Sequence, residues 1–285
     1  MKVLPTALLV PIFFVLLISG CINLPSLASE KFSIAKEEGY EDLHYAVEIY
    51  PSVVWPGKTV KLRILIEPKR DLENVKVVIA DPCLFSVEGK KEKFLGNINA
   101  NTRRYVHFSL KAPEKIDMKT QCEIKLKIIY QANFVVIQDI AVLSEAEEKT
   151  NHISISSTAL PSALEISVSF SKTQPFLSGE KVFMYLDYRN EGSGIIGELN
   201  RGDVKIYLPN NLKLEECSDY SESEEGLILN RNIVFVNGKG KRSACLFRAV
   251  ANSPVDIETM KISGKYKYEI DENVIVTVER GEEGE

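Results

Sequence analysis

Hydrophobic and polar residues alternate through much of the chain after residue 43, and this pattern predicts β-strands. Residues 60–66 alternate apolar and basic side chains before they turn continuously apolar, and residues 123–128 alternate more strictly. Such alternation buries one face of a strand and exposes the other to water, as in antiparallel sheets. Further strands are predicted at 45–50, 75–79, 105–110 and 134–142. Turn residues separate these runs, and no stretch there has a convincing apolar stripe of helical period.

The second half of the chain repeats this pattern. Strands are predicted at 164–170, 182–188, 204–208, 233–236, 244–250, 260–268 and 273–278. Three pairs of segments correspond between the halves: 55–60 with 177–182, 108–113 with 247–252, and 123–141 with 261–278. This indicates a diverged duplication with a period of about 120 residues, too long for a solenoid repeat. About seven short strands per unit predict an all-β fold of two tandem immunoglobulin-like β-sandwiches, at 43–143 and 159–280, with a polar linker at 144–158.

The N-terminus has the features of an export signal. Met1 and Lys2 provide a short positive start, an apolar run covers residues 3–18, and small residues precede Cys21. These features mark a secretory signal. An uncleaved anchor is an open alternative, because the run approaches the about 20 residues that span a bilayer. Both alternatives place the residues after Cys21 outside the cytoplasm.

The residues at 17–21, Leu-Ile-Ser-Gly-Cys, resemble the lipobox of secreted prokaryotic lipoproteins. In that family the cysteine sulfur takes a diacylglyceryl group, and the chain is cut directly before it. The resemblance implies that residues 1–20 are a signal peptide and that Cys21 carries the lipid. Residues 21–42 would then form a tether between the membrane and the folded part. An ordinary signal peptide and an uncleaved anchor are the alternatives.

The other four cysteines are candidates for disulfides. Cys83 and Cys122 lie in the first half, and Cys217 and Cys245 lie in the second. An even number of cysteines in an exported chain favours disulfides. Of the three possible pairings, only Cys83 with Cys122 and Cys217 with Cys245 keeps each bridge within one module. Each bridge would stabilise its module by about 3–4 kcal/mol. Buried free thiols are the alternative, and the connectivity stays open at this point.

Composition narrows the function classes. Charged residues make up 26% of the 285 residues, which excludes a polytopic membrane protein and a low-complexity chain. The chain has 35 basic and 40 acidic residues, so it lacks the basic excess of a nucleic-acid binder. No nucleophile elbow, Walker loop or dinucleotide fingerprint occurs, and the three histidines stand far apart in the sequence. We therefore predict no catalytic, cofactor-binding or metal-ligating residues and no enzymatic activity.

Two acidic segments are the remaining candidates for chemistry. Asp219, Glu222, Glu224 and Glu225 lie close together in sequence, and their carboxylates could ligate calcium. The segment 219–225 lacks the ordered spacing of a calcium loop, so we expect a solvated acidic loop and keep calcium as the alternative. Residues 281–285 are most simply a solubilising tail.

The composition also bears on the source of the protein. Glutamine occurs four times, whereas Lys, Glu and Ile are plentiful. This bias is typical of thermophile proteins and favours an archaeal source.

Two short segments are similar to immunoglobulin-like modules of prokaryotic surface proteins. They are Pro-Gly-Lys-Thr-Val at 56–60, before a predicted strand, and Tyr-Arg-Asn-Glu-Gly at 188–192, after one. The family that they resemble is the CARDB type (cell-adhesion-related domains), in which a strand ends in an Asn-x-Gly turn, here Asn190 and Gly192. Both residues can adopt the positive φ that such a turn often needs. The first module departs from this pattern, because residues 67–71 stand where the turn would be. The resemblance implies a fold and a surface location, and it implies no active site.

These observations together predict a lipid-anchored protein on the extracytoplasmic face of the cell membrane. We expect it to act as a non-catalytic binding or structural module of the cell envelope, in contact with an envelope protein or polymer and without nucleic acid. The alternative is an accessory or substrate-binding subunit of an envelope transporter or secretion system. Solute binders usually have α/β lobes, however, and this chain is predicted to be all-β. A weaker alternative is an envelope hydrolase whose site assembles only in the folded protein.

Overall fold

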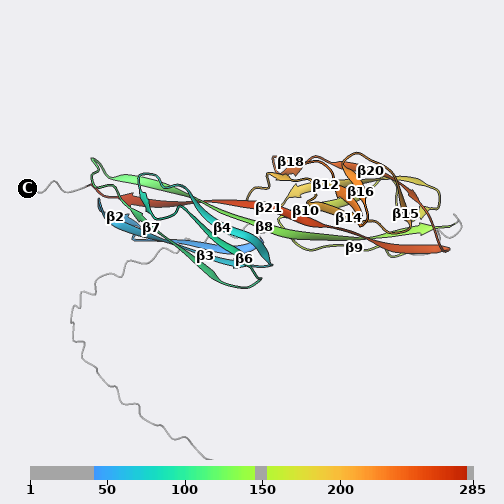
Figure 1. The fold of residues 1–285 in the computed structure, drawn as a ribbon, viewed down its shortest axis with the longest axis horizontal. Helices are drawn as coiled ribbons and strands as arrows, with labels where there is room; N and C mark the ends of the chain where they lie inside the picture. The colour runs from blue at the N-terminus through green and yellow to red at the C-terminus, as the bar shows by residue number, and fades with distance from the viewer. Residues whose placement is uncertain (1–41, 145–152, 281–285) are drawn as a thin grey trace, which may run out of the picture. The chain divides into compact units, whose positions relative to one another are not determined.

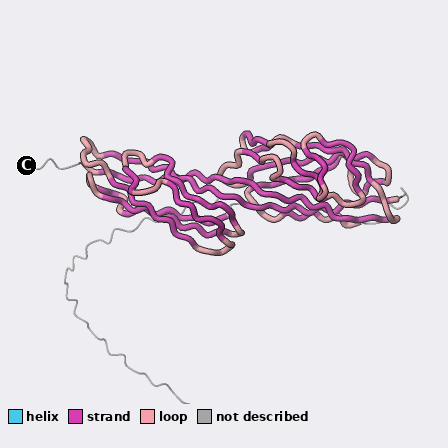
Figure 2. Tube along the Cα trace, in the orientation of Figure 1, coloured by secondary structure: helices cyan, strands magenta, loops and turns pink. Residues whose placement is uncertain are grey.

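The computed structural model describes residues 42–144 and 153–280. All helical or extended elements in these ranges are β-strands, and none is a helix (Figure 1, Figure 2). The prediction of an all-β fold of immunoglobulin-like sandwiches is confirmed. These ranges contain no helix that is long and apolar enough to cross a membrane. Several predicted segments lie outside the described residues: the signal peptide 1–20, the lipidation site Cys21, the tether as far as residue 41, the linker residues 145–152 and the tail 281–285.

One sheet belongs to the first sandwich alone. It contains, in spatial order, β1 (Leu43–Tyr50), β3 (Thr59–Pro68), β7 (Arg104–Lys111) and β5 (Ser86–Glu88). The alternation that predicted a strand at 60–66 lies within β3. Its inward side chains are aliphatic and fully buried: Val60, Leu62, Ile64 and Ile66. These four side chains form much of the first core, and their burial stabilises the sandwich.

A second sheet belongs to the second sandwich alone. Its strands are β13 (Glu198–Leu199), β18 (Ile233–Val236), β19 (Lys239–Gly240), β12 (Lys181–Asn190), β20 (Ser243–Ala249) and β15 (Leu212–Cys217), with β10 (Leu164–Phe170) also paired to β12. The longest of them, β12, points Val182, Met184, Leu186 and Tyr188 into the core. Three of the other strands have only two to four residues, so irregular backbone surrounds this core.

A ten-stranded sheet is common to both sandwiches. Its main path runs through β16 (Tyr220–Ser223), β17 (Gly226–Leu229), β14 (Val204–Tyr207), β21 (Val255–Val278), β8 (Thr120–Leu143), β4 (Leu72–Asp81) and β6 (Glu92–Ile98). The remaining members are β2 (Val53–Val54), which pairs with β21, and β9 (Ser157–Ala159) and β11 (Phe176–Leu177), which pair with β8. The strands β4 and β6 flank the first core, whereas β14, β16 and β17 flank the second.

The two 24-residue strands β8 and β21 pair antiparallel along their whole length, from Thr120 opposite Val278 to Leu143 opposite Val255 (Figure 1). The even-numbered side chains of β8 are buried from Cys122 to Val142 without a break. Because alternate residues of a strand face alternate sides of a sheet, one face of β8 serves both cores. The sheets that belong to one sandwich alone therefore cover the same face of the shared sheet.

The β8–β21 ladder was not expected from the sequence. The segments 123–141 and 261–278, which correspond in the proposed duplication, pair with each other in the structure. The strands predicted at 123–128 and 134–142 are one strand, because alternation continues between them. As a result the first sandwich contains the last part of β21, from the C-terminal end of the chain. The last two residues of the predicted linker, Ser157 and Thr158, belong to β9, which adds to the edge of β8.

Both cysteine pairs adopt the connectivity that keeps each bridge within one module. Cys83 is bonded to Cys122, with a Cα–Cα distance of 5.7 Å. Cys217 is bonded to Cys245, with a Cα–Cα distance of 4.2 Å, across the neighbouring strands β15 and β20. Each bridge closes a loop of the chain around one core and restricts its unfolded state.

The Asn-x-Gly turn after β12 is built differently from the expectation. Neither Asn190 nor Gly192 has a positive φ. The Asn190 side chain accepts a hydrogen bond from the Gly192 N–H at 3.2 Å and donates one to the Gly194 carbonyl at 2.6 Å. A Cβ on Gly192 would lie 2.1 Å from the hydroxyl oxygen of Tyr268. The glycine is thus required by close packing and not by its backbone angle.

Candidate functional site

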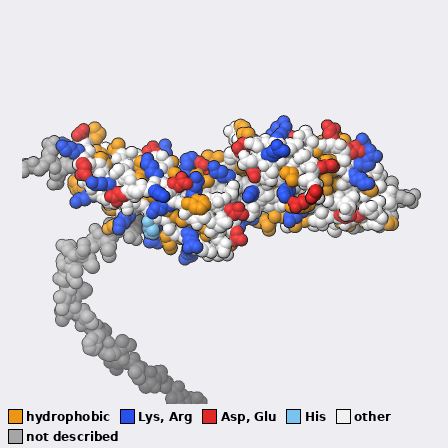
Figure 3. Space-filling view, in the orientation of Figure 1, with side chains coloured by type: hydrophobic (Ala, Val, Ile, Leu, Met, Phe, Trp, Pro, Cys, Tyr) orange, Lys and Arg blue, Asp and Glu red, His pale blue; other side chains and the backbone are white. Residues whose placement is uncertain are grey.

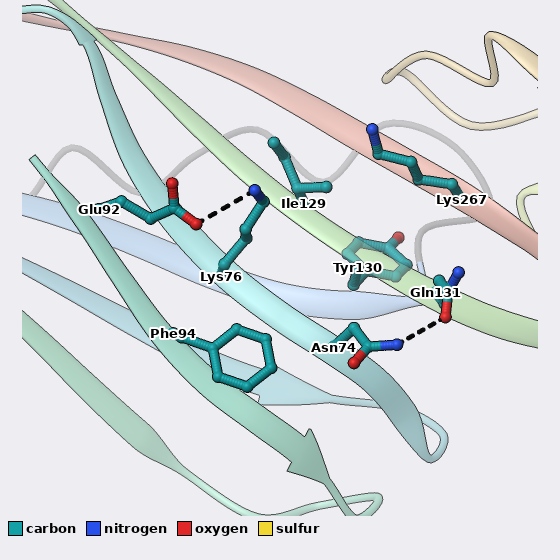
Figure 4. A pocket seen from close by; sticks show the side chains of 8 residues that line it. All are labelled: Asn74, Lys76, Glu92, Phe94, Ile129, Tyr130, Gln131 and Lys267. Atoms are coloured by element: carbon teal, nitrogen blue, oxygen red, sulfur yellow. Dashed lines mark hydrogen bonds and ion pairs between the residues drawn. The ribbon is translucent and has the colours of Figure 1, made fainter.

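A shallow cavity of about 280 Å³ opens on the first sandwich, where β4, β6, β8 and β21 lie side by side (Figure 4). Its lining residues comprise two aromatic side chains, two amides, two cations, one carboxylate and one aliphatic side chain. The lining residues are Asn74, Lys76, Glu92, Phe94, Ile129, Tyr130, Gln131 and Lys267. Each of the four strands contributes at least one of them, so the site depends on the shared sheet.

A β-bulge in β4 shapes one side of the cavity. The register of β4 shifts against β6 and against β8 in the stretch between Leu72 and Lys76. Within it Asn74 has a positive φ of 54°, a conformation that asparagine tolerates better than most residues. Its N–H donates to the side-chain oxygen of Asn97 at 3.2 Å, and its amide donates to the Gln131 side chain at 2.7 Å. The bulge therefore turns an amide toward β8, as bulges next to binding sites often do.

The charges of the cavity are unevenly matched. The Lys76 ammonium lies 3.1 Å from a Glu92 carboxylate oxygen, so these two side chains neutralise each other. Lys267, on the opposite side of the cavity, has no ion-pair partner among the described residues (Figure 4). One positive charge is left over, and the three N–H bonds of Lys267 are available as donors. An anionic, acceptor-rich group is the complement of this arrangement.

An aromatic ring borders the cavity at the edge of the sheet. Phe94 lies on β6, the terminal strand of the shared sheet, and 64% of its surface is exposed. Its ring and the Ile129 side chain give the cavity an apolar part beside the polar one. An exposed ring of this kind offers a flat face to the C–H groups of a ligand.

The side chain of Tyr130, one of the lining residues, faces the core and contacts a buried carboxylate. The Tyr130 hydroxyl donates to Asp42 Oδ2 at 3.4 Å, and the Tyr266 hydroxyl donates to the same oxygen. Arg70 lies with Nη1 3.6 Å from Asp42 Oδ1 and donates to the Asn133 carbonyl at 2.7 Å. Burial raises the pKa of the Asp42 carboxyl, and the Tyr266 hydrogen bond and the Arg70 charge oppose that rise. Burial also raises the pKa of Tyr266, which stays a neutral donor.

The side chains of this cavity can bind a ligand, but they are poorly suited to nucleophilic attack on one. The single carboxylate of the lining, on Glu92, is neutralised by Lys76. The single hydroxyl, on Tyr130, is buried and already donates to Asp42. A nucleophile would need a neighbouring base to activate it, and the lining holds no such pair.

The predicted acidic loop is only partly solvated, and the expectation is wrong for Asp219. This side chain is buried and forms an ion pair with Arg231. The next residues belong to a hairpin of β16 and β17, and Glu225 pairs with Lys205 at 2.9 Å. Pairing to these cations and to a strand overrides the solvation that a run of carboxylates suggests. Within residues 42–144 and 153–280, no group of three or more His, Cys, Asp or Glu side chains is arranged to hold a metal ion.

Sequence reasoning did not select any residue of the cavity. Two signals could have indicated it. Asn74 interrupts an apolar strand run, and Phe94 is the one aromatic residue in the charged stretch 90–94. Lys267 occupies an outward position of β21, where a lysine looks like ordinary surface. Only the pairing of β21 with β8 brings it beside Gln131, its direct partner in the ladder.

Comparison with known proteins adds little to this picture. No protein-family model and no curated protein matches the sequence. Among solved structures, an alpha-2-macroglobulin from Escherichia coli is 11% identical, with a TM-score of 0.25. The match covers 84% of this chain and 33% of the macroglobulin chain. The C-terminal globular domain of an oligosaccharyltransferase from Pyrococcus abyssi is 13% identical, with coverages of 80% and 45% and a TM-score of 0.21.

A third similar structure is a chaperone–tip adhesin complex of CFA/I fimbriae biogenesis, at 15% identity, with coverages of 74% and 93% and a TM-score of 0.14. This chain spans about a third of the macroglobulin chain and less than half of the oligosaccharyltransferase chain. At such TM-scores none of the three carries an argument about function.

Proposed function

We propose that this protein is a non-catalytic binding protein of the extracytoplasmic cell envelope, anchored by lipid at Cys21, and that the cavity on the first sandwich contacts an anionic envelope polymer. The observation that carries the binding role is the combination in one cavity of an uncompensated cation, Lys267, with an exposed ring, Phe94. An acidic sugar has both complements, because its carboxylate suits the lysine and its C–H face suits the ring.

Two further observations support the location. Both sandwiches contain a disulfide, and such bonds persist mainly in oxidising compartments outside the cytoplasm. The N-terminal sequence adds the apolar run and the lipobox-like residues that end at Cys21. Export and anchoring would hold the cavity near the polymers of the envelope.

The anchor is tested by the variant Cys21→Ser in cells that express the full chain. We expect the variant protein to move from the membrane fraction to the soluble extracytoplasmic fraction, because a hydroxyl cannot take a thioether-linked lipid. The control is Cys83→Ser, which removes a cysteine of the first sandwich and should leave the protein on the membrane. Retention of Cys21→Ser on the membrane would contradict lipid anchoring.

The binding role is tested with polygalacturonate, a uronic-acid polymer, against uncharged dextran. We expect the protein to be retained by the acidic polymer, and Lys267→Glu to weaken retention by about tenfold, equivalent to about 1.4 kcal/mol. The control is Lys261→Glu on the same strand, because this lysine lies over the Tyr207 ring and away from the cavity. Equal losses for both variants would show a general charge effect and would refute the assignment of this cavity.

A further inference from the structure

Three loops gather at one end of the first sandwich: 51–58, 82–85 and 112–119. Backbone hydrogen bonds join two of them, from the Gly57 N–H to the Pro113 carbonyl and from the Ala112 N–H to the Lys58 carbonyl, both at 2.9 Å. The third loop is tied to β8, since Cys83 is bonded to Cys122. These three loops and the end of β1 at Tyr50 form what we call the loop end.

The loop end exposes large apolar side chains. Tyr50, Val53, Trp55, Leu84 and Met118 are 72%, 48%, 49%, 49% and 69% exposed. Single exposed hydrophobic residues are ordinary on a protein surface, but five on adjacent loops of one end are not. The space-filling view has hydrophobic, basic and acidic atoms next to each other at this end, where Figure 1 labels β2 (Figure 3).

Lysines surround these apolar side chains. Lys111 and Lys119 are paired, with Glu114 and Glu279 respectively, each at 2.6 Å. Two exposed lysines on these loops, Lys58 and Lys115, have no ion-pair partner among the described residues. A lysine beside an apolar group can lay its methylene chain on that group and keep its ammonium at the level of lipid phosphates.

The shape of the loop end decides between kinds of partner. Trp55, Leu84 and Met118 stand on three separate loops, and the cavity described above has none of them in its lining. A folded protein partner would need a surface complementary to three separate projections, whereas a fluid bilayer adapts to them. Tryptophan and tyrosine also favour the membrane–water interface, because each has an apolar ring and a polar group.

We propose that the loop end binds the surface of a lipid bilayer, with Trp55, Leu84 and Met118 inserted at the level of the headgroups. This surface differs from the polymer-binding cavity, and its action does not require the lipid at Cys21. The covalent chain allows both contacts with one membrane: the 20 residues between Cys21 and Asp42 span at most about 70 Å. The strand β1, which leads from Leu43 to the loop end, spans about 27 Å.

The charges of the loop end determine what should drive binding. On and beside its loops, four lysines are balanced by four carboxylates: Asp81, Glu114, Asp117 and Glu279. We therefore expect apolar insertion to supply most of the affinity. Anionic lipid should strengthen binding only severalfold over a zwitterionic bilayer.

The test uses residues 32–285, which contain all the described residues of both sandwiches. This chain lacks the apolar run and Cys21, so neither can cause membrane binding. Trp55 is the only tryptophan of the protein and reports on the loop end directly. With vesicles of phosphatidylcholine, alone or with a quarter phosphatidylglycerol, we expect a blue shift of its emission and quenching by brominated acyl chains. The absence of both effects with both compositions would overturn the proposal.

Substitutions distinguish insertion of the loop end from non-specific adsorption of the protein to vesicles. Met118→Asp and Leu84→Asp should each lower the vesicle partition coefficient by about tenfold or more, because an ionised carboxylate replaces an apolar group at the lipid surface. The control is Val236→Asp on the second sandwich, since Val236 is 66% exposed and so nearly matches Met118. Equal losses for all three variants would refute the loop end as the contact surface. Thermal unfolding checks that each variant is folded, and Cys21→Ser in cells tests the anchor independently.

Discussion

The two sandwiches share a sheet but fill their cores differently. The first core is aliphatic along β3 and β4, where inward positions hold valine, leucine and isoleucine. The second core contains a hydrogen-bonded group of polar side chains: the hydroxyls of Tyr188 and Tyr220 lie 2.6 Å apart, and Tyr188 donates to Ser243 at 3.2 Å. Of the seven buried polar residues in the described chain, Asp42 is in the first sandwich, and the others are in the second: Gln138, Ser162, Asn211, Asp219, Ser243 and Asp256.

Strand length explains this difference. The strands β3 and β4 have ten residues each, so the ladders satisfy most of the backbone around the first core. Around the second core, β13, β14 and β16 to β19 have two to four residues each. Irregular backbone leaves polar groups without ladder partners, and buried side chains must serve them. Asn211, for example, donates from its buried amide to the Ile140 carbonyl at 3.0 Å. The alternation of apolar and polar residues therefore specifies the first core. In the second core, hydrogen bonds from buried polar side chains help to specify the structure as well.

The largest expected effect tests whether the two sandwiches unfold as one. Gly264 lies on β21 where that strand passes from the second sandwich to the first, and a Cβ there would lie 1.9 Å from the Asp203 carbonyl oxygen. We expect Gly264→Ala to lower the free energy of unfolding by about 3 kcal/mol. Denaturant unfolding should show one transition, shifted as a whole, because β21 belongs to both sandwiches.

The control for this variant is Gly197→Ala, since nothing lies within 4 Å of a Cβ at Gly197. Its effect should stay within about 0.5 kcal/mol. Two separate transitions in Gly264→Ala, with only one of them shifted, would mean that the sandwiches are energetically independent despite the shared ladder.

A smaller effect should follow from the polar group of the second core. Tyr188→Phe leaves Tyr220 and Ser243 with fewer buried partners, and we expect a loss of about 2 kcal/mol in unfolding free energy. Burial raises the pKa of Tyr188 to about 12, so the hydroxyl is neutral over the whole working range. The control Tyr185→Phe removes a hydroxyl from the same strand outside that group. An equally stable Tyr188→Phe would contradict the contribution of polar satisfaction to this core.

The smallest effect concerns pH, and it has opposite signs in the two sandwiches. Burial raises the pKa of Asp42 above its unfolded value, so the folded state binds more protons and this group lowers stability as pH rises from about 4. Hydrogen bonds from Ser156 and Thr259 lower the pKa of Asp139, whose contribution is present above pH 4 and is lost as pH falls.

We therefore expect Asp42→Asn to make stability rise more steeply with pH above about 4, and Asp139→Asn to make it rise less steeply with pH below about 4. Thermal unfolding midpoints in both ranges provide the measurement, with Asp117→Asn on an exposed loop as the control. Slopes that change in the same direction for both variants would contradict the opposite environments of these two carboxyls.

Sequence patterns predicted the local structure of the first sandwich better than that of the second. The alternation of 60–66 lies within β3, and the run at 75–79 lies within β4. In the second sandwich the predicted solvated loop 219–225 is a hairpin with a buried Asp219, because its partner Arg231 is six residues beyond the segment. No pattern within the segment reveals that partner. The sequence patterns also did not indicate the cavity. Its residues Lys267 and Gln131 are 136 residues apart in sequence and become neighbours only where β21 pairs with β8.

The amino-acid sequence by itself determined the class of fold, since alternation of apolar and polar residues allows one face of each strand to be buried. It also restricted the disulfides, because only one pairing keeps each bridge within a module. Tertiary structure alone decided that β8 and β21 form one ladder through both sandwiches. It likewise decided that Phe94 and Lys267 border one cavity and that Trp55, Leu84 and Met118 share one end. The physical reason is that strand alternation is a local signal, whereas the choice of partner strand depends on contacts between residues far apart in the chain.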